Sequence, residues 1–250
     1  MQSEPQAKKI IIIGASSGIG LELAKLYVAS GCMVGITGRR KVLLENFQQR
    51  FPANVLMECF DVTSPAATAH LRSLIEKMNG LDILIYSAGF GQINETLNWE
   101  IDHETTVTNV NGFISIANYA FNYFIKQGSG QLAAISSVAS IRGNSRAPAY
   151  SAAKAFISRY LEGLSIKAFK TKMPDGTKPQ IAITDIQPGF VNTKAIESPV
   201  LFWMAPVEKA ALQIYKAIEK KKRRAYITRR WAIIAWLLKV VPYSVYKRFG

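Results

Sequence analysis

Short apolar segments alternate with longer stretches of helical periodicity along most of the chain. The apolar segments are rich in β-branched residues, and this pattern predicts strands that are buried on both faces. We place these strands at Lys9–Ile13, Met33–Thr37, Val55–Phe60, Ile83–Tyr86, Gln131–Ile135, Gln180–Ile186 and Ala225–Thr228.

Helices are expected between the strands, where apolar residues recur on one helical face. The stretch from Glu100 to Gln127 should be helical with a break near Thr105–Asn109. The other predicted helices cover Ile19–Ala29, Val42–Phe51, Pro65–Met78, Tyr150–Phe169, Pro206–Lys220 and Trp231–Tyr246.

Apolar strands separated by helices indicate an α/β fold, a doubly wound, Rossmann-like, parallel sheet of seven strands with helices on both faces. We expect one domain, residues 1–250, with no repeat or long linker. Residues 1–8 form an N-terminal extension, 9–228 the core, and 229–250 a basic and apolar helical tail.

A glycine-rich turn follows the first predicted strand and opens the first helix. Glycines here let the backbone approach a pyrophosphate, and the helix N-terminus supplies free N–H groups. The alternative is a helix-opening turn with glycines that serve only packing. The segment reads Gly14-Ala15-Ser16-Ser17-Gly18-Ile19-Gly20.

The second strand leads into Arg39 and Arg40, and no carboxylate occurs before Glu45. NAD-binding sites place an acidic residue near this point, whereas arginines suit the 2′-phosphate of NADP. We therefore favour NADP(H) over NAD(H), the alternative being a solvated charge pair. Further cofactor contacts are expected where later strands end, at Asp61, Val62, Ala88 and Gly89.

Tyr150 and Lys154 lie one helical turn apart, thirteen and seventeen residues after Ser137. A lysine ammonium and a cationic nicotinamide would lower the pKa of the phenol, which could then exchange a proton with a carbonyl or alcohol oxygen. Ser137 follows the fifth strand at the carboxyl edge of the sheet, where its hydroxyl could hold that oxygen. On its own, a Tyr-x-x-x-Lys spacing on a helix is usually a pair of surface side chains without a catalytic role.

From Lys9 to about Thr228 the chain resembles the short-chain dehydrogenase/reductase family, which has the glycine turn, an Asn, the Ser and Tyr-x-x-x-Lys in this order. The resemblance implies that Asn109 holds a water in a proton relay and that Lys154 also bonds the nicotinamide ribose. It implies that Pro188-Gly189-Phe190-Val191-Asn192-Thr193 contacts the carboxamide, chiefly through Val191 and Thr193. Ser17 stands where the family often has a basic NADP marker, which leaves that role to Arg39 and Arg40.

The same resemblance implies a homodimer or homotetramer built through the helices that begin near Gly112 and Tyr150. The sequence is less informative about the substrate site. A lid is expected over Lys194–Pro206, and the expected substrate is an apolar carbonyl compound or alcohol. By position, the residues around Tyr150 are Phe90, Ile93, Ile141, Arg142 and Phe190. A nucleotide-binding scaffold without turnover is the rival class, and consumption of NADPH would separate the two.

Positive charge concentrates at the C-terminal end of the chain, whose net charge is +14. Residues 216–250 hold 11 Lys/Arg and only Glu219, whereas residues 1–215 hold 20 Lys/Arg and 16 Asp/Glu. This asymmetry argues against nucleic-acid binding over the whole surface. Trp231–Leu238 is too short to span a bilayer and has no clean polar face, so we expect it to pack on protein, with contact to a membrane surface as the alternative.

The chain has no recognisable signal peptide, because Met1–Lys9 is polar and Ile10–Ile13 is too short an apolar run. Cys32 and Cys59 stand in unrelated settings without metal-ligand spacing, so no metal is expected. We therefore expect a cytoplasmic protein with reduced thiols, peripheral to a membrane if the tail contacts lipid.

Overall fold

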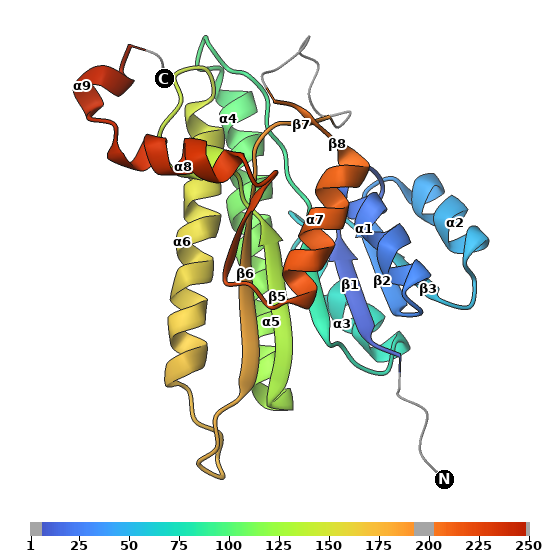
Figure 1. The fold of residues 1–250 in the computed structure, drawn as a ribbon. Coiled ribbons are helices and arrows are strands. Elements are labelled where there is room, and N and C mark those ends of the chain that lie inside the picture. Colours follow the sequence, from blue (N-terminus) through green and yellow to red (C-terminus); the bar gives the residue numbers. More distant parts are fainter. Residues whose placement is uncertain (1–6, 193–202, 249–250) are drawn as a thin grey trace.

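The computed structural model describes residues 7–192 and 203–248, and its centre is a sheet of seven parallel strands. The strand order is β3-β2-β1-β4-β5-β6-β9 (Figure 1). Strands β2 and β3 are therefore added on one side of β1, and the strands from β4 onwards are added on its other side. The predicted doubly wound sheet is confirmed. The strands are β1 (Lys9–Ile13), β2 (Met33–Gly38), β3 (Val55–Cys59), β4 (Ile83–Tyr86), β5 (Ser129–Ile135), β6 (Gln180–Pro188) and β9 (Arg224–Ile227).

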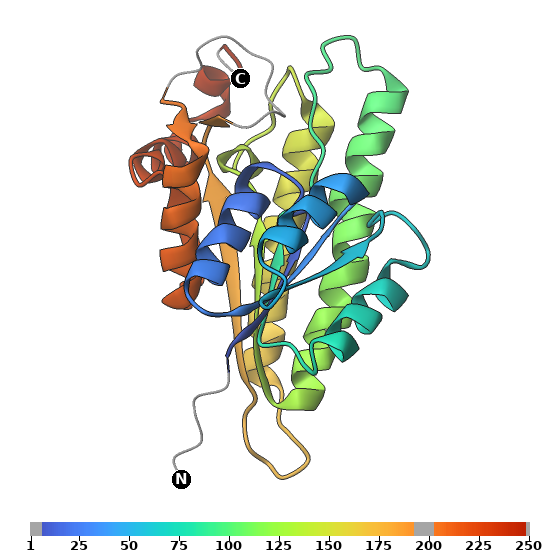
Figure 2. The ribbon, with the colours of Figure 1, turned by 90° about the vertical axis from the view of Figure 1, so that its right-hand side faces the viewer.

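Helices cover both faces of the sheet, as Figure 2 shows with orange α7 and green α5 on opposite sides. One layer contains α1, α2 and α7, and the other contains α3, α5 and α6. Their bounds are α1 (Gly18–Ala29), α2 (Lys41–Arg50), α3 (Ala67–Lys77), α5 (Phe113–Gln127), α6 (Pro148–Lys170) and α7 (Val207–Glu219).

The first strand shows why two layers form. Ile10 and Ile12 belong to the core under α1 and α7, whereas Ile11 and Ile13 belong to the core under α3 and α5. Successive side chains of a strand point to opposite faces, so a strand that is apolar at every position needs a cover on both. All four isoleucines are fully buried.

The long helical stretch after β4 is interrupted where the sequence predicted a break. Helix α4 (Trp99–Thr106) passes through a π-helical segment, η1 (Val107–Gly112), into α5. Asn98 caps α4 by accepting hydrogen bonds from the backbone of Glu100 and Ile101. A π-helical segment changes which side chains face the sheet, and such segments occur often at functional sites.

The C-terminal tail differs from the single helix that the sequence predicted. Two helices form, α8 (Trp231–Val240) and α9 (Tyr243–Tyr246), because Pro242 cannot continue the hydrogen-bonding of α8 and holds Val241 extended. Two further short strands, β7 (Val191–Asn192) and β8 (Ala205–Pro206), pair beside the end of β6. No helix within the described ranges is long and apolar enough to cross a membrane.

Candidate active site

The glycine turn forms a close contact between the ends of β1 and β4. Gly14 has φ +86°, and a Cβ placed on it would lie 2.6 Å from the backbone nitrogen of Ala88. A Cβ on Gly20 would collide with the carbonyl oxygen of Gly14. Ser17, the N-cap of α1, makes no side-chain capping bond, so its hydroxyl does not occupy the first N–H groups of the helix. This backbone cradle fits a dinucleotide pyrophosphate.

Arg40 reaches back from the end of β2 to the glycine turn. Its guanidinium donates to Ser16 Oγ at 2.7 and 3.1 Å and to Ser17 Oγ at 2.5 Å. Arg39 lies near Asp61, with 3.7 Å between Nη1 and Oδ2, and its side chain is 61% exposed. Two guanidinium groups and two hydroxyls thus surround the place where β2 ends, and such donors match a phosphomonoester.

Ser137 and Tyr150 are brought together at the carboxyl end of β5. Ser137 begins the short 3-10 turn η2 (Val138–Ser140) and accepts a hydrogen bond from the backbone of Ala139 at 3.1 Å. Tyr150 stands in the first turn of α6, and the Ser137 side chain lies close enough to its phenol to lower the pKa. The backbone at Gly91 covers the Tyr150 ring, because a Cβ there would lie 2.5 Å from it.

Lys154 lies behind the Tyr150 ring, one turn further along α6. Its Nζ is 5.6 Å from the ring centroid and donates to the carbonyl oxygen of Ile135 at 3.0 Å. The side chain is buried, and burial lowers the pKa of Lys154 to about 8 against a smaller opposing effect of Asp185.

Lys154 alone does not lower the pKa of Tyr150, an effect that the sequence analysis expected from Lys154 together with a cationic nicotinamide. Burial raises the pKa of the phenol above its ordinary value, and the adjacent Ser137 side chain lowers it by less. Lys154 is itself desolvated behind the ring, and its charge does not offset the burial of the phenol. A raised pKa keeps the Tyr150 phenol neutral at neutral pH.

Asn109 lies in the π-helical segment and is fully buried. Its side-chain amide donates to the carbonyl oxygen of Phe90 at 2.5 Å and accepts from the Phe90 amide at 3.0 Å. A Cβ on Gly89 would lie 3.0 Å from Asn109 Oδ1 and 3.4 Å from Lys154 Nζ. Gly89 therefore lets the chain pass close to both side chains, and Asn109 fixes the segment that covers Tyr150.

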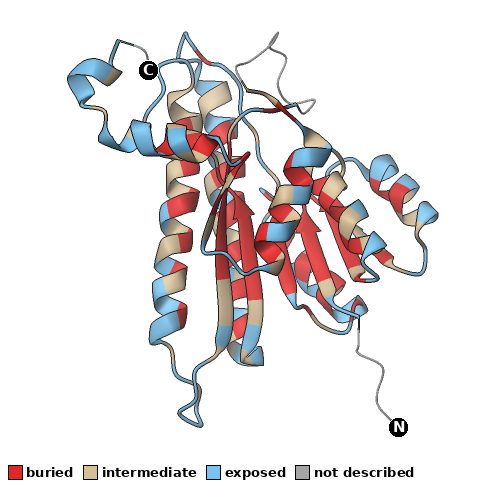
Figure 3. Cartoon of the chain, viewed as in Figure 1, coloured by how far each residue is buried: buried red, intermediate tan, exposed pale blue. Residues whose placement is uncertain are grey.

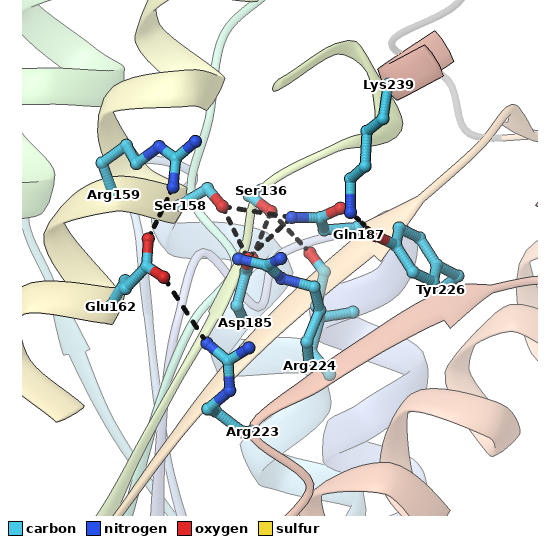
Figure 4. Close-up of polar contacts among 11 residues, drawn as sticks. Ser136, Ser158, Arg159, Glu162, Asp185, Gln187, Arg223, Arg224, Tyr226 and Lys239 are labelled. Carbon is cyan, nitrogen blue, oxygen red and sulfur yellow. Dashed lines mark hydrogen bonds and ion pairs between the residues drawn. The ribbon is translucent and has the colours of Figure 1, made fainter. Parts of the chain in front are cut away.

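The buried carboxylate of Asp185 stabilises the site, and no sequence motif indicated this residue. Asp185 on β6 accepts from Ser136 Oγ at 2.5 Å and Ser158 Oγ at 2.7 Å (Figure 4). Gln187 donates to it at 2.7 Å, and Arg224 lies at 3.3 Å. The contacts link β5, β6, α6 and β9, so they fix the strand end that carries Ser137 against the helix that carries Tyr150. Pairing between distant segments leaves no local pattern in the sequence.

The segment after β6 packs against the start of the C-terminal tail. A Cβ on Gly189 would overlap the Trp231 ring, and the Phe190 ring meets Trp231 edge-on at 5.4 Å. Pro188 ends β6, and its carbonyl oxygen lies 3.4 Å from Ser137 Oγ. Val191 is buried, and Thr193 lies outside the described residues, as does most of the expected lid, 194–202.

The residues expected around the substrate differ in their surroundings. Phe90 and Ile141 are half-buried, whereas Ile93 and Phe190 are exposed by 47% and 39%. Arg142 points to the tail, where Nη1 donates to the carbonyl oxygens of Leu238 and Val241 at 3.3 and 3.1 Å. Of the other expected contacts, Ile19 in the first turn of α1 packs against the core, and Val62 is buried against Gly112.

A dinucleotide cradle beside a half-buried Ser and Tyr and a buried Lys on an open parallel sheet defines a class of nicotinamide-dependent oxidoreductases. Residues 8–199 match the family described as short chain dehydrogenase. The chain belongs to the short-chain dehydrogenase/reductase family and is an NAD(P)-dependent oxidoreductase.

Known relatives cover most of the chain. An uncharacterized oxidoreductase of Myxococcus xanthus (strain DK1622) is 31% identical over 198 residues, 77% of this chain and 75% of that protein. A fatty acyl-CoA reductase of Acinetobacter baylyi is 28% identical over 246 residues, 93% of this chain and 80% of that protein. A short-chain dehydrogenase from Sphingobium yanoikuyae, solved in complex with NADPH, has a TM-score of 0.78 at 20% identity, covering 95% of this chain and 97% of that one.

Proposed function

We propose that this protein transfers a hydride between NADP(H) and the carbonyl or secondary alcohol of an apolar substrate, in the direction of ketone reduction. One observation carries the proposal: the Ser137 side chain lies beside the Tyr150 phenol while buried Lys154 lies behind the Tyr150 ring, at the strand ends that also hold the glycine turn. A scaffold without turnover has no need of a buried lysine, because burying its charge is costly.

Tyr150 is the proton donor. A bound nicotinamide cofactor would supply the hydride for the carbonyl carbon. Ser137 would hold the carbonyl oxygen beside the Tyr150 hydroxyl, which would give its proton to that oxygen. Lys154 holds the ribose and stabilises the phenolate that remains. Asn109 completes a relay that returns a proton towards Lys154.

The preference for NADP(H) over NAD(H) rests on the end of β2. Arg40 and Arg39 supply forked donors there, and Ser16 and Ser17 add hydroxyls within reach of Arg40. A 2′-phosphate would receive charge-assisted hydrogen bonds from these groups, whereas an uncharged ribose would not. Contacts to the rest of the cofactor are proposed for Gly14, Gly18, Ile19, Gly20, Asp61, Val62, Ala88, Gly89, Pro188, Gly189, Val191 and Thr193.

The substrate is proposed to be an apolar ketone, because Phe90, Ile141 and Phe190 belong to the segments around Tyr150. A second candidate shares the chemistry: a reductase of lipid-like or steroid-like ketones that works at a membrane surface. The exposed apolar side of α8 favours it, and a relative of this chain is named a fatty acyl-CoA reductase.

A cytoplasmic homodimer or homotetramer is proposed as the working form. The outer faces of α5 and α6 border a groove of about 420 Å³ whose lining includes Asn118, Arg159 and Tyr160. The groove lies on the helices through which the family resemblance implies assembly. Static light scattering of the purified protein tests this, because a monomeric mass would contradict it.

Replacement of Tyr150 by Phe tests the proposed chemistry. The variant lacks only the hydroxyl, so NADPH binding should be retained while turnover of an apolar ketone falls by at least about 100-fold. Consumption of NADPH is followed at 340 nm, and cofactor binding is measured by fluorescence. If the variant keeps most of its activity, Tyr150 is not the proton donor.

A further inference from the structure

The outer side of the C-terminal tail is an apolar stripe that the domain leaves uncovered. Trp231 and Ala235 turn one side of α8 into the domain and are buried. The opposite side is exposed, which Figure 3 shows as pale blue along α8 and α9. The spacing of three and four residues puts these side chains on one helical face. They are Ile233 (61% exposed), Trp236 (61%), Leu237 (41%) and Val240 (53%), continued by Tyr243 (73%).

The stripe is held in place from within the molecule. Arg142 donates to the last carbonyl oxygens of α8, and its guanidinium lies 4.6 Å from the centroid of the Tyr246 ring. The Tyr246 hydroxyl donates to the carbonyl oxygen of Gly143 at 2.6 Å, and Lys239 donates to Tyr226 at 3.1 Å. These contacts hold the inner side of the tail against the domain, and the apolar side therefore faces outward.

Cations flank the stripe along the chain. Residues 229–250 contain five Lys or Arg and no Asp or Glu. Arg229 and Arg230 precede α8, while Lys247 and Arg248 follow α9, and all four are exposed. A surface that combines exposed tryptophan, tyrosine and aliphatic side chains with flanking cations matches the interface of an anionic bilayer.

We propose that the outer side of α8 and α9 docks on the surface of an anionic lipid bilayer, with Trp236 and Tyr243 at the interface and the flanking cations on lipid headgroups. Helix α8 is about 15 Å long, too short to cross a bilayer, so it lies in the plane of the surface. A second copy of the chain is the poorer occupant, because a two-fold contact would oppose two sets of like charges.

Docking would bring lipid to the substrate end of the enzyme. The loop that holds the tail, Arg142 and Gly143, follows η2 directly after Ser137, and Trp231 packs on Gly189. Both contacts belong to segments around Tyr150, at the end of the molecule that carries α8 and α9 (Figure 1). This part of the inference rests on the second candidate function and specifies its substrate as a ketone dissolved in the membrane.

Flotation of the full-length protein with vesicles tests the docking. Vesicles of phosphatidylcholine with about one third phosphatidylglycerol should carry the protein, and pure phosphatidylcholine vesicles should carry little. Trp236→Ser should reduce binding at least about fivefold, because it removes the interfacial tryptophan. Trp99→Ser, at a tryptophan 69% exposed on α4, is the matched control and should bind as the wild type does.

A charge pair separates headgroup attraction from apolar contact. Lys247→Glu with Arg248→Glu should weaken binding to anionic vesicles at least about fivefold, whereas Lys126→Glu with Lys172→Glu, at exposed positions where α5 and α6 end, should not. Failure of the wild type to float, or equal loss in tail and control variants, would overturn the proposal. A tail variant that lowers the mass in light scattering without any vesicle binding by the wild type would assign the stripe to a second copy instead.

Turnover of a water-soluble ketone, measured on the same samples, keeps the two proposals apart. Vesicle binding with no turnover would leave the docking standing and remove the reductase. Turnover without vesicle binding would remove the docking alone. Trp236→Ser should keep its turnover in solution, because its side chain faces away from the domain.

Discussion

Lys154 has an unusual environment for a lysine, because its ammonium is enclosed and its nearest acceptor is the backbone carbonyl of Ile135. Burial lowers the pKa of Lys154 to about 8, and Asp185 limits the fall. Keeping this group protonated inside the fold costs stability, which a residue retained for packing alone would not require. The lysine is thus a residue whose benefit must lie in binding or chemistry.

Replacing Lys154 by Met should reveal that cost as a pH dependence. Below about pH 8 the lysine is protonated in the folded and unfolded states, so the full cost, about 3 kcal/mol for a shift of this size, is present. Between about pH 8 and the unfolded pKa near 10.5, the folded state gives up its proton first and the cost falls. Wild-type stability should therefore rise relative to Lys154→Met across this window.

Differential scanning calorimetry of both proteins from pH 6.5 to 9.5 measures the effect. The Met variant should be the more stable protein at the acidic end, with a difference that shrinks as pH rises. A difference in Tm that stays constant across this range would show that the lysine is not held at a lowered pKa. Turnover of the variant should be lost at every pH.

The proposed preference for NADP(H) depends on Arg39 and Arg40. Replacing both by Ala should weaken NADPH binding at least tenfold, because each charge-assisted hydrogen bond contributes about 1.5–3 kcal/mol. NADH binding should change by less than about threefold, since that cofactor has no 2′-phosphate. Titration calorimetry with both cofactors gives the comparison, and equal affinities of the wild type for NADPH and NADH would contradict the assignment.

Spacing along the chain predicted Ser137, Tyr150 and Lys154 as one group, and the family resemblance added Asn109; the structure places these side chains close to one another. Spacing was not sufficient for Asp185, whose partners come from three other elements. The raised pKa of Tyr150 also depends on burial, which no local pattern reports. Residue types could be predicted, but their electrostatic surroundings could not.

At the scale of elements, the strands and helices of the core follow the sequence prediction to within a few residues, since apolar runs and helical periodicity determine them. The tail departs from it. Pro242 divides the expected helix, and the side of α8 that faces the domain is covered while the other is open. The prediction that the tail packs on protein therefore holds for one side, that of Trp231 and Ala235.

Arg142 should be the clamp between the tail and the loop after Ser137. Arg142→Ala removes two hydrogen bonds of a charged group and the contact with Tyr246, which we expect to lower stability by about 2 kcal/mol. For a chain of this size, that corresponds to a fall in Tm of about 5 °C. Thermal unfolding followed by circular dichroism measures it.

Arg146→Ala is the matched control. Arg146 stands four residues later and pairs with Glu95 through side chains that are 60% and 62% exposed. An exposed ion pair contributes little, so this change should lower Tm by less than about 2 °C. Equal effects of the two substitutions would show that Arg142 does not hold the tail.

At the scale of the whole molecule, the candidate site residues gather at one end of the sheet. The carboxyl ends of the strands carry the glycine turn, Ser137 and the segment at Gly189, and the tail lies at this same end (Figure 1). Ligands of open parallel sheets bind at this end, where the strand order reverses. The basic tail beside the site makes this end of the molecule positively charged.

The central claim is that this protein moves a hydride from NADPH to a ketone carbon, and isotope transfer tests it most directly. The wild type is incubated with an apolar ketone and NADPH that carries deuterium in both positions at nicotinamide C4. Mass spectrometry of the alcohol should show one deuterium on the carbinol carbon, with the label absent from the product of heat-inactivated enzyme. An alcohol formed without deuterium, or no alcohol from any ketone in a broad apolar panel, would contradict the account.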